Sequence, residues 1–184
     1  MPTVLVHDTR LEGPTPTAMA DYSFDVDAQF PIAGLIQTIS GTAASSISRL
    51  MIMCHGYEST DTGSACIPMS LGFGLQLCRE DLTLANVSVM NGLYNCAADI
   101  ILYACGPANT APFANGTYGD GRRFCSEMAA YTNANVYASD VTQSYNNLRY
   151  DPTRLVCEVI PIDFGQWEGN VYRFSPDGSV TRVQ

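Results

Sequence analysis

The stretch IILYACGPANT, residues 100–110, decides the fold that this sequence predicts. Its first residues are apolar, β-branched or aromatic, and a short run of this kind predicts a buried strand. The run ends abruptly at Ala104, Cys105 and Gly106, after which the chain becomes polar. We therefore expect a cysteine thiol at the carboxyl end of a strand.

A second stretch, LMIMCHGYEST (residues 50–60), repeats this pattern with an imidazole in place of the thiol. Its apolar run leads directly to His55 and Gly56, and the polar residues begin there. The two stretches together predict two strands, each of which ends in a reactive side chain followed by glycine.

Strand and helix patterns alternate around these two stretches. Further strands are predicted at residues 3–7 and 135–139, and helices at 29–46 (beginning near Pro31), 79–93 and 121–134. This alternation indicates an α/β fold with a mainly parallel central sheet, in which the carboxyl ends of the strands carry the chemistry. His55, Cys105 and Asp140 all lie at predicted carboxyl ends.

The segments between these elements have loop or hairpin patterns. Residues 10–28, 56–65 and 107–121 have loop composition, and 66–77 is typical of a hairpin outside the main sheet. The closing stretch WEGNVYRFSPDGSVTRVQ (167–184) alternates around an Asp-Gly turn, which predicts a C-terminal antiparallel hairpin. We expect this hairpin to pack on the main sheet, so that residues 1–184 form a single domain.

The composition restricts the classes of partner. The chain has 184 residues, 46% of them hydrophobic, and a net charge of −9, which repels phosphate backbones and anionic lipid. Nucleic acid and membrane are therefore not expected as partners. No signal peptide is recognisable at the N-terminus. We expect a cytoplasmic protein, with non-classical export left open.

The seven cysteines are odd in number and none forms a C-x-x-C pair, so they indicate reduced thiols in a reducing compartment. A secreted disulfide framework is the less favoured alternative. Only two histidines are present, His7 and His55, and no carboxylates supplement them at ligand spacing. We expect neither a metal nor another cofactor.

The two strand ends carry residues suited to acyl transfer. A thiol attacks a carbonyl as thiolate, and an adjacent imidazole can orient or deprotonate it. If the two strands are neighbours in a parallel sheet, His55 and Cys105 lie within reach of one substrate. Glycine at 56 and 106 lets the chain leave the sheet sharply and lets backbone N–H groups, those of Gly56 and Cys105, approach an oxyanion.

These motifs resemble those of the caspase-like (clan CD) cysteine peptidases, which include caspases, gingipains, clostripain, separase and the CHAT domains. His55-Gly56 and Ala104-Cys105-Gly106 match the two signatures, and their separation of 50 residues matches that expected of a caspase. ADIILYACGPANT, GDGRRFCSEMAAYTNANVYAS and WEGNVYRFSPDG are most similar to the bacterial DUF4347 family. The resemblance covers roughly residues 48–180.

The resemblance implies a three-layer caspase-like sandwich, a mainly parallel sheet flanked by helices. It implies a thiol endopeptidase with Cys105 as nucleophile and His55 as acid and base, acting on a protein or peptide substrate. The substrate pocket would lie beside the cysteine, with Asp140 and Tyr103 as candidates and Asp140 favouring a basic residue before the cleaved bond. Tyr103 stands where metacaspases carry an acid and caspases carry glutamine, so neither calcium activation nor a preference for aspartate is implied.

The same residues also allow other interpretations. The chain could be a catalytically inactive relative that retains the fold as a binding or regulatory module. Cys54 is expected in the core, because its side chain points to the opposite face of the strand from His55. Asp140 alone is equally typical of a helix or turn cap. A serine hydrolase is not supported, because no G-x-S-x-G motif occurs. The oligomeric state is left open.

Overall fold

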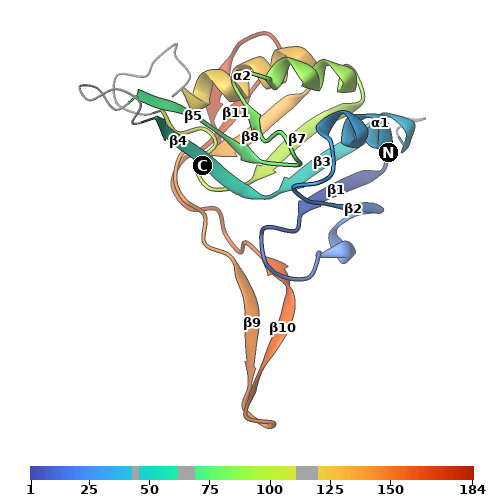
Figure 1. The fold of residues 1–184 in the computed structure, drawn as a ribbon, viewed down its shortest axis with the longest axis vertical. Helices are drawn as coiled ribbons and strands as arrows, with labels where there is room; N and C mark the ends of the chain where they lie inside the picture. Colours follow the sequence, from blue (N-terminus) through green and yellow to red (C-terminus); the bar gives the residue numbers. More distant parts are fainter. Residues whose placement is uncertain (43–45, 62–68, 111–119) are drawn as a thin grey trace.

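The computed structural model describes residues 1–42, 46–61, 69–110 and 120–184 (Figure 1). Its centre is a seven-stranded sheet in the order β12-β11-β8-β7-β3-β1-β2. The strands of this sheet are β1 (Thr3–Asp8), β2 (Tyr22–Val26), β3 (Ile47–Met53), β7 (Ala97–Tyr103), β8 (Asn135–Ser139), β11 (Val171–Phe174) and β12 (Val180–Arg182). The first five pair in parallel, whereas β11 and β12 pair antiparallel. The predicted mainly parallel sheet and the C-terminal hairpin are both confirmed.

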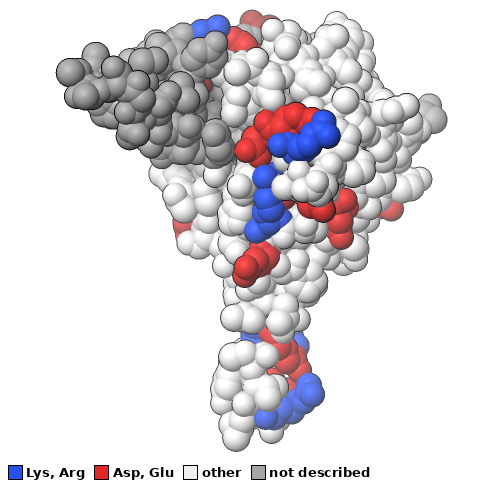
Figure 2. Space-filling view, in the orientation of Figure 1, with Lys and Arg blue, Asp and Glu red and all other residues white. Residues whose placement is uncertain are grey.

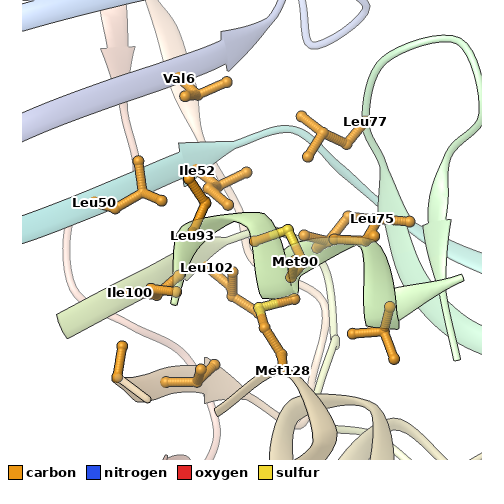
Figure 3. Packing of buried hydrophobic residues seen from close by; sticks show 14 of the residues in the cluster. Val6, Leu50, Ile52, Leu75, Leu77, Met90, Leu93, Ile100, Leu102 and Met128 are labelled. Atoms are coloured by element: carbon orange, nitrogen blue, oxygen red, sulfur yellow. The ribbon is translucent and has the colours of Figure 1, made fainter. Parts of the chain in front are cut away.

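The two α-helices and one 3-10 helix contribute apolar side chains to one large core on a single face of the sheet. These elements are α1 (Ile32–Thr42), η2 (Val87–Leu93) and α2 (Gly121–Thr132). Figure 3 shows Met90 and Leu93 of η2 and Met128 of α2 together with Ile100 and Leu102 of β7. Leu50 and Ile52 of β3 also belong to this helix-side core.

Both α-helices form where the sequence predicted them. Pro31 precedes α1, whose buried residues recur at helical spacing at Ile32, Leu35, Ile36 and Ile39. Asp120 caps α2 by accepting a hydrogen bond from the Arg123 N–H at 3.1 Å. Asn133 ends α2 in the left-handed conformation.

Two segments differ from the sequence predictions. The loop expected at 10–28 contains a 3-10 turn, η1 (Thr17–Met19), and the strand β2. The alternation of Tyr22, Phe24 and Val26 is the pattern of a strand, and parallel pairing with β1 completes it. The helix expected at 79–93 is only η2, preceded by the short strand β6 (Leu82–Thr83).

The hairpin predicted at 66–77 is instead part of a larger one. Residues 66–68 lie outside the described residues, and β5 (Met69–Gln76) pairs antiparallel with β4 (His55–Asp61), in the segment expected to be a loop. With β6 these strands form a separate three-stranded sheet. The expectation of an excursion from the main sheet is thus correct, but its first strand begins at His55 itself.

The second face of the main sheet carries a smaller apolar cluster and a long projecting ribbon. Leu5, Met51 and Met53 form this cluster with Leu11 and Ile162. The ribbon consists of β9 (Asn146–Asp151) and β10 (Val156–Asp163), which extend away from the body (Figure 1).

The ribbon has one charged side and one uncharged side (Figure 2). Glu158 pairs with Arg149 at 3.1 Å and with Arg154 at 2.7 Å. The register pairs Leu148 with Val159 and Tyr150 with Cys157 on alternate positions, which places their side chains on the opposite side. The exposed ribbon therefore adds little to the core.

No helix in the described ranges combines the length and the apolar character that a membrane span requires.

Burial of one core thiol predicts a measurable pH dependence of stability. Cys125 of α2 is fully buried, and burial raises the pKa of its thiol above the ordinary value of 9.0. The unfolded chain loses this proton first as the pH rises, so the folded state binds more protons above about pH 9 and stability falls with increasing pH. In Cys125→Ala, the fall in unfolding free energy between about pH 9.5 and 11 should be shallower by about 1.4 kcal/mol per pH unit.

Urea unfolding at a series of pH values measures this slope. Cys157→Ala is the matched control, because Cys157 is exposed and its loss should leave the slope unchanged. An equal slope in Cys125→Ala and wild type would contradict a thiol held protonated by burial.

Candidate active site

The register of β3 and β7 brings the two reactive strand ends together. Met53 pairs with Tyr103 in this parallel pair, and the Cys54 N–H then donates to the Tyr103 carbonyl at 3.2 Å. The pairing therefore extends to the residues immediately before His55 and Cys105. Both residues lie at the same end of the sheet on adjacent strands, as the sequence predicted.

Cys54 and Ala104 are buried in the helix-side core, whereas Met53 and Tyr103 belong to the cluster on the second face. Residues 55 and 105 lie two positions beyond the last residues of β3 and β7, and continued alternation predicts both side chains on the second face. The expectation that Cys54 is a core residue is confirmed.

The backbone of Gly56 lies directly against that of Cys105. A Cβ added to Gly56 would stand only 1.8 Å from the Cys105 carbonyl oxygen and 2.6 Å from its carbonyl carbon. Only glycine allows this approach. Gly106, in contrast, has φ +58°, a conformation that lets the chain turn sharply away from β7.

The ring of His55 is held by a backbone carbonyl from the N-terminal segment. Its Nε2 lies 3.0 Å from the Arg10 carbonyl oxygen. Because a carbonyl can only accept a hydrogen bond, Nε2 carries the proton in this contact, and the neutral ring keeps its lone pair on Nδ1. His55 is thereby oriented with one nitrogen available as a base.

A buried ion pair fixes the segment that supplies this carbonyl. Asp8, which is fully buried, accepts hydrogen bonds from Nε and a terminal nitrogen of Arg10, both at 2.8 Å, and from the Cys78 N–H at 2.8 Å. Arg10 also contacts Asp81 at 3.2 Å. Its hydrogen bonds to Asp8 raise the pKa of the guanidinium above its ordinary value. This network was not predicted from the sequence, although Asp8 directly follows the first predicted strand.

Cys105 is partly exposed, and its thiol lies against the loop that follows β8. Its Sγ lies 3.7 Å from the Gln143 carbonyl oxygen. The buried Gln143 side chain bonds Ser139 Oγ at 2.9 Å and both the N–H and the carbonyl of Glu168, at 2.9 and 3.0 Å. The loop that faces the thiol is therefore fixed to the strand end of β8.

The buried thiols differ in environment from Cys105, which is partly exposed, as is Cys96. Burial raises the pKa of Cys78 to about 12 and that of Cys54 well above its ordinary value. Cys66 lies outside the described residues, and the other six cysteines are free. Cys105 thus differs from the buried thiols in being accessible.

Two backbone amides at the strand ends were predicted to bind an oxyanion. They are the N–H groups of Cys105 and Gly56. The N–H of the next residue, Gly106, donates to the Val141 carbonyl at 2.9 Å and cannot bind an oxyanion as well. Within the described ranges, the Cys105 N–H meets no such acceptor. The Gly56 backbone, which touches Cys105, is the second predicted contributor.

The two pocket candidates have different surroundings. Asp140 accepts hydrogen bonds from the backbone and side-chain nitrogens of Asn170 at 3.0 and 2.8 Å, so its carboxylate holds the loop before β11. Tyr103 lines an open pocket on the second face, where its ring lies 5.5 Å from that of Phe164 and 5.4 Å from that of Trp167.

His7 lies one strand away from His55 but is occupied elsewhere. It is 1% exposed, with Nδ1 2.9 Å from Thr15 Oγ1 and Nε2 2.8 Å from the Leu11 carbonyl oxygen. Within the described ranges, no group of three His, Cys, Asp or Glu side chains is arranged to hold a metal ion.

The chain matches no protein-family model, no curated protein and no solved structure in the three comparisons.

The contact between Gly56 and Cys105 predicts a severe effect of one added methyl group. Gly56→Ala should lower the free energy of unfolding by about 2 kcal/mol or more, because the new Cβ overlaps a backbone carbonyl that must move. Thermal or urea unfolding measures the loss.

Gly41→Ala is the matched control for this substitution. Gly41 lies in α1, and nothing stands within 4 Å of an added Cβ, so alanine should stabilise the protein by about 0.5–1 kcal/mol. A Gly56→Ala protein as stable as wild type would show that the two strand ends do not touch.

Proposed function

We propose that this protein is a cysteine endopeptidase of the caspase-like type, with Cys105 as nucleophile and His55 as general acid and base. The proposal depends on one observation: the Gly56 backbone touches that of Cys105, which brings residues 55 and 105 to the same end of two adjacent parallel strands. Acyl transfer to a thiol requires a sulfur and a base within reach of the same substrate carbonyl.

The proposed reaction has two halves. His55 Nδ1 takes the proton from Cys105 Sγ, and the sulfur forms a bond to the carbonyl carbon of the substrate peptide. The amides of Cys105 and Gly56 donate to the resulting oxyanion. When this intermediate collapses, the C–N bond breaks and the imidazolium gives its proton to the leaving amine, which leaves a thioester. His55 then deprotonates a water molecule that hydrolyses the thioester and restores the thiol.

The caspase-like sandwich is part of this proposal. The parallel order β1-β3-β7-β8 and the position of both reactive residues at its carboxyl end support it. Among the described residues, α1, η2 and α2 share one core, whereas the opposite cluster is completed by Leu11, Ile162 and their neighbours. A helical layer on both faces therefore remains a prediction.

The proposed substrate is a protein or peptide, and the proposed location is a reducing compartment such as the cytoplasm. Six free cysteines in the described residues support the second point, because a nucleophilic thiol persists where disulfides are disfavoured.

A non-catalytic binding module is the alternative. One contact favours it: the Gln143 carbonyl oxygen lies 3.7 Å from Cys105 Sγ, and a carbonyl can accept a hydrogen bond only from the protonated thiol. Catalysis requires His55 to compete with this carbonyl for the thiol proton.

Peptide cleavage tests the proposal directly. Wild type should cleave a peptide mixture that presents every residue type before the cleaved bond, as measured by mass spectrometry. Cys105→Ala should abolish cleavage, and His55→Ala should reduce it by about 10²–10⁴-fold because it removes the acid and base. The exposed Cys157→Ala is the control and should cleave as wild type does. No cleavage by wild type, or undiminished cleavage by Cys105→Ala, would contradict the proposal.

A further inference from the structure

A pocket of about 200 Å³ lies on the second face of the sheet, between β7, β8 and β11. Its lining residues are Ile101, Tyr103, Tyr137, Trp167, Val171, Val183 and Gln184. Pockets for whole small molecules measure about 300–1,000 Å³, so this one has the size of a subsite for a single side chain.

The pocket adjoins the proposed nucleophile. Tyr103 is the last residue of β7 and Cys105 follows two residues later, so their Cα atoms are at most about 7 Å apart. The sheet order places β8 on one side of β7 and β3 on the other. Cys105 therefore stands between His55 and the pocket, at a separation that one side chain of a bound peptide can span.

The chemistry of the pocket is apolar and aromatic. Tyr103 is stacked on Phe164 and meets the edge of Trp167, which gives the pocket a rigid aromatic wall. None of the described side chains that line it carries a charge. The Nε2 of Gln184, the only side-chain amide among them, donates to the Trp167 carbonyl at 2.6 Å.

Among the described residues that line the pocket, no side chain offers a counter-ion to a charged substrate residue. Asp140, the one acid that the sequence suggested for a basic substrate residue, is hydrogen-bonded to Asn170 and faces the Tyr172 hydroxyl at 3.4 Å. A charge buried without a partner is strongly disfavoured, whereas an apolar side chain gains from the same burial.

We propose that this pocket binds a large uncharged apolar or aromatic side chain, that of the residue immediately before the cleaved bond. The inference rests on the proposed function for its link to cleavage, but binding to the pocket can be measured without any turnover. The preferred residue before the cleaved bond would then be apolar or aromatic, and not the basic residue that Asp140 alone would favour.

Trp167 is the only tryptophan of the chain and lines the pocket, so its fluorescence reports on occupancy. The experiment uses Cys105→Ala and three peptides that lack tryptophan and differ only in having Phe, Arg or Asp before the scissile bond. The Phe peptide should change the Trp167 emission saturably and bind at least about tenfold more tightly than the other two.

Two substitutions on the same exposed strand end provide the test and its control. Val183 lines the pocket and is 51% exposed, whereas Val180 is 45% exposed and does not line it. In the Cys105→Ala background, Val183→Phe should fill the pocket and weaken binding of the Phe peptide about tenfold or more. Val180→Phe should leave this binding unchanged.

The outcomes separate this inference from the proposed function. Equal or tighter binding of the Arg or Asp peptide, no change in Trp167 emission, or no effect of Val183→Phe would overturn the pocket assignment. Cleavage by wild type after Arg or Asp would also overturn it while leaving the peptidase proposal intact. Preferred binding of the Phe peptide by a protein that cleaves nothing would support the pocket and refute the peptidase.

Discussion

Backbone pairing between β3 and β7 is the constraint on which the candidate site depends. The hydrogen bond from the Cys54 N–H to the Tyr103 carbonyl carries the parallel register to the last residues before the two reactive side chains. Beyond it, the absence of a side chain at Gly56 lets the next backbone segment touch the Cys105 carbonyl. A shift of one residue between these strands would send one of the two side chains to the helix-side core.

The N-terminal segment completes the site from the other side. Asp8 is a buried carboxylate, which is costly unless it is paired, and Arg10 pairs with it through two hydrogen bonds. The backbone carbonyl of Arg10 also accepts the hydrogen bond from His55 Nε2. The ion pair is thus linked to the orientation of the imidazole through a single residue, so the site depends on the folding of β1 as well as on the two central strands.

Helices and strands that form from a local residue pattern could be predicted from the sequence. Apolar runs and helical spacing were sufficient to place β7, β8, α1 and α2. Two strands were missed: β2, although its residues alternate as in a strand, and β4, whose polar residues are held in a strand by pairing with β5. The partners of His55 and Cys105, the carbonyls of Arg10 and Gln143, could not be predicted either, because backbone carbonyls carry no signal in a sequence.

A crosslink tests most directly whether the two strand ends share one rim. In His55→Cys, dibromobimane becomes fluorescent only when it joins two thiols a few ångströms apart, and peptide mapping identifies which residues it has joined. We expect a bridge between positions 55 and 105 in the folded protein and none in wild type or His55→Ala. Single labelling of both cysteines without a bridge would show that the two strand ends do not share one rim.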